Sequence, residues 1–433
     1  MQYIPLNSST HILLQPLDRK KTEIEIIFAA GGSWFEDYHD RGKKHLLEHC
    51  IASRTKMMNF QELKDFQYRE NIMLNAYTGP ITMGLTASGH SSDFYKMIDL
   101  LLEMTFTPTF DQEILDREKE IVLREISERR GDPNYRLHFD TIKNIFTTDS
   151  YSSHEVLGDS DKVALTSLAD FKKMHTQHLN QSHIIISISG GNIDQAYLMN
   201  KMEYYLKNTL ELLGIENKIP VDFQADNTFL DFQILPIVHE LAHSHAEVSV
   251  YIPCEVNFEN KPALQIFENL FLKYGGVLYD RLRDELGLVY GIQSSFDYNM
   301  QVLEISLSCE IQYVEQIVDE ILSVFSDFEK NFNSTKFNEF KNIIQKKQDI
   351  AQDTLGAGTY FTQNILRIYG VPEIYENYAK RLDLVSLDNV KSIYDYVQNN
   401  FAKMRVVIVS NNPDINKLSQ TLIQKYIQTT KIL

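Results

Sequence analysis

Two segments in different halves of the chain follow the same order of structural signals. Residues 167–194 run from a polar amphipathic helix pattern into a β-branched strand pattern and a Gly-Asn turn, and residues 386–414 do the same with an Asn-Asn turn. The helix patterns begin after Ser167 and Ser386, and the strand patterns begin at Ile184 and Val406, so the two segments keep nearly the same offset. This spacing indicates one α+β unit that occurs twice, and we take the step from Ile184 to Val406 as the repeat offset.

Length and composition agree with two globular domains. The chain has 433 residues, 43% of them hydrophobic and 23% charged, which is enough for two or three domains and unlike a disordered protein. Periodicity fades in residues 214–233, where Asn, Asp and Pro collect, and we interpret this stretch as a linker. We therefore expect a first domain at 1–213 and a second at 234–433, each of the α+β class.

Charge and motif content exclude several classes of partner and chemistry. The formal net charge of −17 argues against nucleic acid or an anionic membrane as the main partner. No signal peptide pattern, membrane-length apolar run, P-loop, GxGxxG or CxxC occurs in the sequence. Three scattered cysteines, Cys50, Cys254 and Cys309, suggest neither a disulfide framework nor a cysteine zinc site. We expect a cytoplasmic protein.

The stretch HLLEH contains a histidine pair at the spacing that zinc ligation on a helix requires. Taking His45 as the origin, Glu48 lies at about −60° and His49 at about +40° around a helix, so all three share one face. Two imidazoles and a carboxylate would then point into a common space. The alternative interpretation is a solvated polar face without a metal.

A catalytic zinc needs a third protein ligand, and residues 111–132 offer one. This stretch reads as a helix with Asp111 at its N-cap, and both Glu118 and Glu125 fall inside its apolar stripe. Glutamates are rarely buried unless they are paired or bind a cation. Ion pairs with Arg129, on the same stripe, are the alternative explanation.

A second histidine motif, HELAH at 239–243, matches the signature of a different zinc peptidase class. Ligation through HExxH needs a sustained helix, but this stretch follows Pro236 and passes into the alternating run AEVSVYIP. We interpret it as the extended approach to a strand, and keep a zincin-type hydrolase as a less favoured alternative.

The complete constellation closely resembles the pitrilysin/insulinase family of zinc metallopeptidases. HLLEH is followed 76 positions after His49 by Glu125, with Glu118 seven residues before that glutamate. The resemblance implies that His45, His49 and Glu125 bind zinc, that Glu48 is the general base, and that Glu118 is a supporting carboxylate. The size and duplicated layout look most like the branch of the mitochondrial processing peptidase subunits and their bacterial relatives.

The resemblance extends beyond the metal motif. AAGGSWFED at 29–37 looks like the small-residue and acidic stretch before the family's zinc helix. LNAYTG at 74–79 looks like the family's substrate-binding edge, which implies substrate contacts for Asn75 and Ala76; a turn asparagine is the alternative for Asn75. The pair Lys43–Lys44 departs from the family, which usually has an aliphatic and a small residue there.

The second half lacks the zinc residues but contains another family feature. At the repeat offset, Glu118 and Glu125 correspond to Phe340 and Lys347, which cannot bind zinc in this role. Arg283 and Tyr290 are similar to the family's arginine and tyrosine pair, seven residues apart, which completes the active site. A surface arginine and a core tyrosine are the alternative interpretation.

These observations predict a zinc-dependent endopeptidase with one Zn²⁺ per chain. Two homologous domains, each a mixed sheet flanked by helices, would form half of a clamshell, and short or unstructured peptides would bind as an added strand inside a closed chamber. We expect a homodimer in which Arg283 and Tyr290 act in trans; a heterodimer with a related subunit is the alternative. A noncatalytic scaffold subunit is the rival function.

Overall fold

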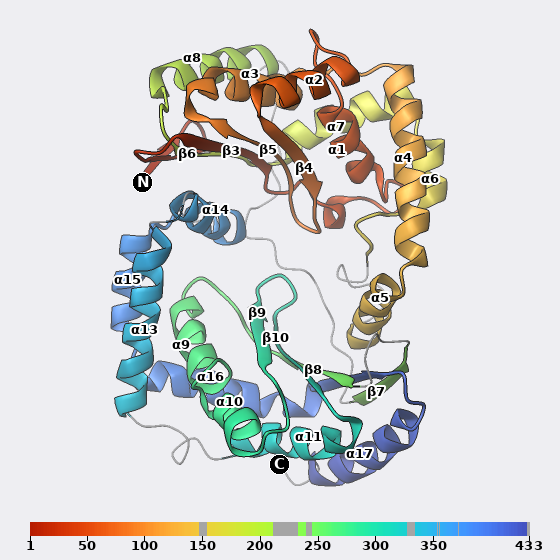
Figure 1. Ribbon diagram of the computed structural model, residues 1–433, viewed down its shortest axis with the longest axis vertical. Helices are drawn as coiled ribbons and strands as arrows, with labels where there is room; N and C mark the ends of the chain where they lie inside the picture. Colours follow the sequence, from red (N-terminus) through yellow and green to blue (C-terminus); the bar gives the residue numbers. More distant parts are fainter. Residues whose placement is uncertain are drawn as a thin grey trace. The chain divides into compact units, whose positions relative to one another are not determined.

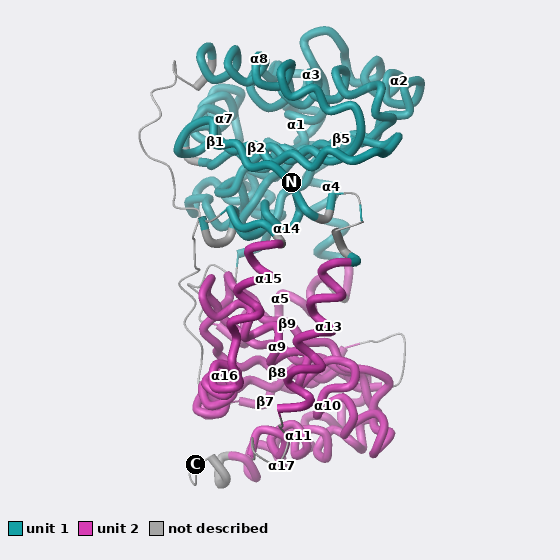
Figure 2. Tube along the Cα trace, turned by 90° about the vertical axis from the view of Figure 1, so that its left-hand side faces the viewer, with its two compact units in different colours: residues 1–131, 154–223, 350–375 teal, residues 132–153, 224–349, 376–433 magenta. Residues whose placement is uncertain are grey.

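The computed structural model describes residues 1–146, 154–210, 233–239, 245–326, 334–352, 354, 356–370 and 372–430. The chain divides into two compact units, which Figure 2 distinguishes by colour. Unit 1 comprises 1–131, 154–223 and 350–375, and unit 2 comprises 132–153, 224–349 and 376–433. Each unit is described by itself.

The units are not contiguous in sequence. Helix α5 (Pro133–Ile145) belongs to unit 2, where Ile142 and Ile145 pack into a core cluster with strand residues. Helix α14 (Ala357–Tyr369) belongs to unit 1, where Leu366 packs with Leu13 and Ile185. Relative to the domains expected at 1–213 and 234–433, residues 132–153 of the first domain lie in unit 2. Residues 350–375 of the second domain lie in unit 1. Those boundaries describe the duplicated sequence and stay a prediction, and 214–232 of the expected linker lie outside the described residues.

Unit 1 is built on a six-stranded mixed sheet in the order β1-β2-β6-β3-β5-β4 (Figure 1). Strand β2 pairs with β6 in parallel, whereas the other described pairings in this sheet are antiparallel. Alternation in β3 buries Ile24 and Ile26 and leaves Glu23 and Glu25 partly exposed on the opposite face. The strands are β1 (Gln2–Pro5), β2 (Thr10–Pro16), β3 (Lys21–Phe28), β4 (Met73–Thr78), β5 (Met83–His90) and β6 (Ile184–Gly190).

Helices cover both faces of this sheet. Helices α1 and α3 pack on strands β3 to β5, and α14 packs on β2 and β6. Helices α4, α6 and α7 contact α1, and α8 contacts α3. The helices are α1 (Lys43–Ala52), α2 (Phe60–Glu70), α3 (Phe94–Phe106), α4 (Gln112–Gly131), α6 (Ser160–Leu165), α7 (Leu168–Gln181) and α8 (Gln195–Tyr205), with short turns η1 (Ser33–Phe35), η2 (Ser91–Asp93) and η4 (Leu206–Leu210).

Unit 2 repeats the arrangement with a five-stranded sheet in the order β7-β11-β8-β10-β9, in which β7 and β11 are parallel. Its strands are β7 (Gln233–Val238), β8 (Ala246–Pro253), β9 (Ile292–Asp297), β10 (Val302–Cys309) and β11 (Arg405–Ser410). Its helices are α5, α9 (Lys261–Phe271), α10 (Val277–Tyr279), α11 (Val314–Val324), α13 (Ser334–Gln352), α15 (Tyr375–Leu384), α16 (Leu387–Asn399) and α17 (Ile415–Thr430), with turns η5 (Asp280–Glu285), η6 (Ile311–Tyr313) and η7 (Phe401–Lys403); α13 and α15 each cross a unit boundary by a few residues.

Strand registers confirm the duplication. In unit 1, Ile26 of β3 pairs with Leu85 of β5, and in unit 2, Val248 of β8 pairs with Leu307 of β10. The second pair is related to the first by the repeat offset, and all four side chains are buried. A one-residue slip would turn apolar side chains to the opposite face, so the shared register reflects the same apolar alternation in both halves. The α+β class with two duplicated domains is thus confirmed.

Candidate metal centre and active site

Helix α1 contains the HLLEH motif, and its apolar and polar side chains lie on opposite faces, as the sequence pattern predicts. Its apolar side, which includes Leu46, Leu47 and Ile51, is fully buried against the fold. The side chains of His45 and His49 are 8% and 20% exposed, and they emerge on the other side of the helix. Burial of the apolar side therefore fixes the direction in which the two imidazoles point.

Helix α4 supplies the third group from a distant part of the sequence. Asp111 precedes the helix and accepts a hydrogen bond from the Ile114 N–H, as the N-cap prediction requires. Glu125 Oε2 lies 3.6 Å from His45 Nε2 and 3.5 Å from His49 Nε2. The potential ligand atoms of these three residues all lie within 4.8 Å of one another.

The two distances from Glu125 fit a tetrahedral zinc site. Ligand atoms about 2.1 Å from a tetrahedral zinc lie about 3.4 Å apart, close to the separations between Glu125 and the two imidazoles. The centres of the His45 and His49 rings are 4.9 Å apart, and the two ring planes are nearly perpendicular. Within the described part of the chain, this is the one group of His, Cys, Asp and Glu with a metal-binding arrangement.

Glu118 orients the His49 ring through its Nδ1 atom, while the Nε2 atom faces Glu125. Glu118 Oε2 lies 3.4 Å from His49 Nδ1, while Glu118 Oε1 accepts from Arg117 Nε at 3.0 Å and Nη2 at 2.6 Å. A protonated Nδ1 that donates to Glu118 leaves Nε2 available to a metal. Burial alone would raise the pKa of Glu118, but the bonds from His49 and Arg117 outweigh burial and lower it. The carboxylate is therefore ionised in its buried position.

The cation beside Glu118 is not the one that we weighed from the sequence. Among the contacts of the described residues, Arg129 makes no ion pair with Glu118 or Glu125. Arg117 takes this role instead, and its guanidinium also lies 4.4 Å from the centre of the Phe60 ring. Arg117 was missed because it lies outside the apolar stripe; its position next to Glu118 was the one available signal.

The protonation states of the imidazoles differ. Burial and the neighbouring His49 lower the pKa of His45 to about 4, so its ring is neutral at pH 7. Burial also lowers the pKa of His49, but the carboxylates of Glu118, Glu48 and Glu125 outweigh burial and raise it. Three carboxylates around one imidazole make this a region of negative potential that favours a cation.

Glu48 lies beside the potential ligands without belonging to them. Burial raises the pKa of its carboxyl, and Glu125 acts in the same direction, whereas His49 lowers it. A carboxylate with a raised pKa that is not itself a ligand suits a general base. Glu48, His49 and Glu118 line one pocket together with the predicted substrate residues Asn75 and Ala76.

Those two residues belong to the last strand of the unit 1 sheet. Strand β4 pairs on one side with β5, where Asn75 faces Thr86 and Ala76 faces Leu85. The side chain of Asn75 is on the more exposed face, and Ala76 is half-buried. The structure thus places part of an edge strand in the same pocket as Glu48, His49 and Glu118, and substrate contacts of Asn75 and Ala76 stay a prediction.

Comparisons with known proteins agree with these observations. Residues 18–159 match the family model "Insulinase (Peptidase family M16)", and residues 166–344 match "Peptidase M16 inactive domain". The chain belongs to the insulinase (M16) peptidase family.

Relatives of this M16 chain match it at low identity, over most of its length or over about half of it. It is 21% identical over 372 residues to an uncharacterized zinc protease of Rickettsia bellii, a match that covers 85% of this chain and 84% of the relative. It is 23% identical over 220 residues to the mitochondrial-processing peptidase subunit beta of Saccharomyces cerevisiae, covering 49% and 47%. A putative M16-like peptidase from Alicyclobacillus acidocaldarius has the same fold, with a TM-score of 0.74 at 13% identity and coverage of 94% and 97%.

In the second half of the M16 chain, the positions that match the two histidine ligands form apolar core. At the repeat offset, His45 and His49 correspond to Phe267 and Phe271 on α9. Their rings are 4.8 Å apart and stacked, and both side chains are fully buried. Phe340 is buried as well, so these positions of unit 2 pack side chains and hold no metal ligand.

Arg283 and Tyr290 lie together in unit 2. The Arg283 guanidinium is 5.2 Å from the centre of the Tyr290 ring, and Tyr290 is 89% exposed. The chain reverses between them at Gly287, whose φ of 63° favours glycine. Tyr290 is therefore no core tyrosine, and the predicted role of the pair in catalysis stays a prediction.

The HELAH motif falls mostly outside the described residues. Strand β7 ends at Val238, and the His239 N–H donates to the Ser410 carbonyl at 2.9 Å, which continues the extended pairing with β11. Residues 240–243 are not described.

Two further observations concern the helices and the cysteines. Of the helices in the described part of the chain, none is both long and apolar enough to cross a membrane. The three cysteines are free and buried.

Proposed function

We propose that this M16 chain is a zinc-dependent endopeptidase. The observation that carries the proposal is that the potential ligand atoms of His45, His49 and Glu125 all lie within 4.8 Å of one another, with Glu48 in the same pocket as His49. The donor set of two imidazoles and one carboxylate is typical of catalytic zinc, which keeps its fourth position for water or substrate.

The roles of the residues follow from their geometry. Zinc at this point would polarise a water molecule and stabilise negative charge on the substrate carbonyl oxygen. Glu48 takes the proton from the water and returns it to the leaving amine. Glu118, held by Arg117, keeps His49 in the tautomer that leaves Nε2 available. No serine or cysteine nucleophile is required.

We propose that the substrate is a short or unstructured peptide that adds to the edge of β4. Backbone hydrogen bonds along a strand give affinity with little dependence on sequence, and the pocket beside Asn75 and Ala76 accommodates a side chain. Arg283 and Tyr290, supplied by a second copy of the chain, would bind the substrate carbonyl and complete a closed chamber. A heterodimer with a related subunit is the alternative assembly, and the cytoplasmic location stays a prediction.

A noncatalytic scaffold is the second candidate function, because the model that matches 166–344 is described as an inactive domain. That match begins after Glu125, so it does not include the proposed ligand set. The complete set of His45, His49 and Glu125 lies within residues 18–159 and favours the peptidase.

The test combines metal analysis with peptide cleavage. Purified protein should contain one zinc per chain and cleave an unstructured peptide, and Glu48→Gln should keep the zinc while cleavage falls by roughly 100-fold or more. Glu240→Gln, in HELAH, is the matched control, and its zinc content and rate of peptide cleavage should stay near the wild-type level. If Glu240→Gln abolishes cleavage while Glu48→Gln retains it, the assignment to HLLEH is wrong; zinc-containing protein with no cleavage of any peptide would favour the scaffold.

A further inference from the structure

Helix α1 begins without the usual stabilising residues. Its N-cap is Gly42, with a φ of 92° and no side-chain hydrogen bond to the helix, and no acidic residue occurs in its first turn. The first turn instead contains Lys43 and Lys44, whose positive charges are unfavourable at the positive end of the helix dipole. The free N–H groups of this turn therefore need an acceptor from elsewhere.

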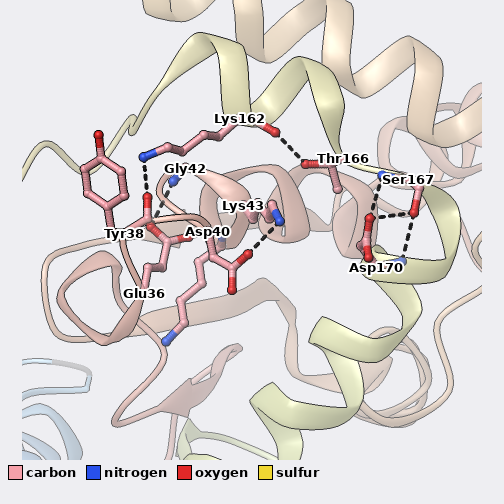
Figure 3. A network of polar contacts seen from close by, with 10 residues as sticks. Glu36, Tyr38, Asp40, Gly42, Lys43, Lys162, Thr166, Ser167 and Asp170 are labelled. Carbon is pink, nitrogen blue, oxygen red and sulfur yellow. Dashed lines mark hydrogen bonds and ion pairs between the residues drawn. The ribbon is translucent and has the colours of Figure 1, made fainter.

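Glu36 is that acceptor. Its Oε2 accepts from the Gly42 N–H at 2.9 Å, and its Oε1 accepts from the Lys44 N–H at 2.5 Å. The residue is only 9% exposed, so the carboxylate is built into the protein interior, and Figure 3 shows it below Gly42 at the start of the helix. One carboxylate from the preceding loop thus caps two positions of the helix that holds the metal ligands.

Lys44 completes the arrangement. It is 6% exposed, its Nζ donates to the Ala30 carbonyl at 3.1 Å, and its ammonium lies 5.3 Å from the centre of the Phe35 ring. Burial raises the pKa of Glu36 to about 7 and lowers the pKa of Lys44 to about 8, while each charge offsets part of the other's burial. The departure of Lys44 from the family pattern is therefore matched by a buried opposite charge.

The same loop is held from its outer side. Lys43 Nζ forms an ion pair with Asp40 at 2.6 Å, and the Lys162 ammonium lies 3.5 Å from the centre of the Tyr38 ring (Figure 3). At Gly158, a Cβ atom would lie 2.1 Å from the Gly42 Cα, so the loop packs there at backbone distance. The loop before α1 is thus a fixed support from which Glu36 reaches the helix.

His45 depends on this support more than His49 does. Glu118 holds the Nδ1 atom of His49, whereas the buried Nδ1 of His45 has no hydrogen-bond partner among the described residues. The direction of the His45 ring is consequently set by the backbone of the first turn and by packing. That turn is where Glu36 binds.

We propose that Glu36 is a positioning residue of the metal centre, which acts by fixing the first turn of α1 and with it the direction of His45. This inference rests on the proposed zinc function. Metal ligands must be held within about 0.5 Å of the productive geometry, and a helix whose first N–H groups lose their acceptors frays at that end. Loss of Glu36 should therefore affect the metal before it affects the fold.

The experiment compares Glu36→Ala and Glu36→Gln with Asp40→Asn, which removes the charge of Asp40 from its partly buried ion pair with Lys43 in the same region. Zinc affinity is measured by competition with a chelator, the visible spectrum of the Co²⁺-substituted protein reports the coordination geometry, and hydrogen exchange of residues 43–52 is followed in zinc-free full-length protein. We expect zinc affinity to fall about 10- to 100-fold in Glu36→Ala, less in Glu36→Gln, and within twofold in Asp40→Asn. The Co²⁺ spectrum and the exchange of 43–52 should change in the same order.

A purely structural role would lower the melting temperature without changing the Co²⁺ spectrum or the zinc affinity of the folded variant, and that result overturns the inference. If Glu36→Ala does not fold, Glu36→Gln decides by the same criteria. If wild-type protein binds no zinc, the proposed function fails, whereas unchanged exchange of 43–52 in the zinc-free variants would separately overturn the role of Glu36.

Discussion

At the scale of single residues, the two histidines of the proposed metal centre are held in different ways. His49 is held on both ring nitrogens, by Glu118 at Nδ1 and by Glu125 at Nε2, whereas His45 contacts Glu125 through Nε2 and relies on its helix for orientation. Three carboxylates near two imidazoles are destabilising when no cation lies among them, because like charges repel. A divalent cation removes that repulsion.

Glu125→Gln should weaken zinc binding, since it replaces a charged ligand and leaves the proton carrier Glu48 intact. We expect zinc affinity to fall at least 10-fold, with cleavage partly restored by excess zinc. Titration of the purified variant with zinc, followed by metal analysis and peptide cleavage, measures both. Wild-type zinc content in Glu125→Gln would remove Glu125 from the ligand set.

Arg117→Met should lower zinc affinity by about 10-fold, because Glu118 would lose both hydrogen bonds that hold it toward His49. Arg124→Met on the same helix is the matched control, since the Arg124 side chain is exposed and its one hydrogen bond among the described residues goes to the Glu120 backbone carbonyl. Chelator competition on the two variants gives the comparison. Equal affinities would mean that Arg117 does not position Glu118.

At the scale of elements, unit 1 contains a buried histidine away from the metal centre that makes its stability depend on pH. His175 of α7 is buried, its Nε2 lies 3.0 Å from the Thr105 carbonyl oxygen, and its ring contacts Phe110. Burial lowers the pKa of His175 to about 4, although the bond to Thr105 acts in the opposite direction. The folded protein therefore takes up this proton at lower pH than the unfolded chain.

As the pH falls below about 6.5, the unfolded chain binds this proton and the folded protein does not, so stability is lost progressively toward pH 4. Between pH 7.5 and 5.5 we expect His175 to account for roughly 1 kcal/mol of the decrease in unfolding free energy. His175→Gln should be less stable at pH 7.5 but lose less on acidification. Urea unfolding of zinc-free protein at both pH values measures this, and exposed His39→Gln should follow the wild type. Parallel curves for wild type and His175→Gln would contradict the prediction.

At the scale of the whole molecule, one architecture serves two purposes. Both halves keep the same strand register, yet the positions of the two proposed histidine ligands in one half are stacked phenylalanines in the other. A buried aromatic pair stabilises the fold by apolar burial, whereas the ligand set introduces buried polar groups that are costly without a cation. We therefore expect the half with the polar cluster to be the less stable one when no cation is bound.

If Arg283 of one copy completes the zinc site of another, two inactive variants should restore activity together. The variants Glu48→Gln and Arg283→Ala are mixed in equal amounts under conditions that allow subunit exchange. Half of the dimers should then contain one subunit of each variant, and each of these mixed dimers has one complete site. Peptide cleavage should then recover to about a quarter of the wild-type level, the statistical expectation for a symmetric dimer. Sedimentation of the wild type at assay concentration should show a dimer, and an active monomer or a mixture without recovery would contradict the prediction.

Periodicity in the sequence determined which side chains share a helix face and which share a strand face. His45, Glu48 and His49 had to lie together once α1 formed, and the internal repeat implied two related sheets, because these relations depend on local geometry alone. Only the tertiary structure decided that Arg117, and not Arg129, holds Glu118, that α14 packs in unit 1, and that Glu36 caps α1. Such contacts join residues from separate elements, and the packing of buried side chains selects one partner among several that the sequence leaves equivalent.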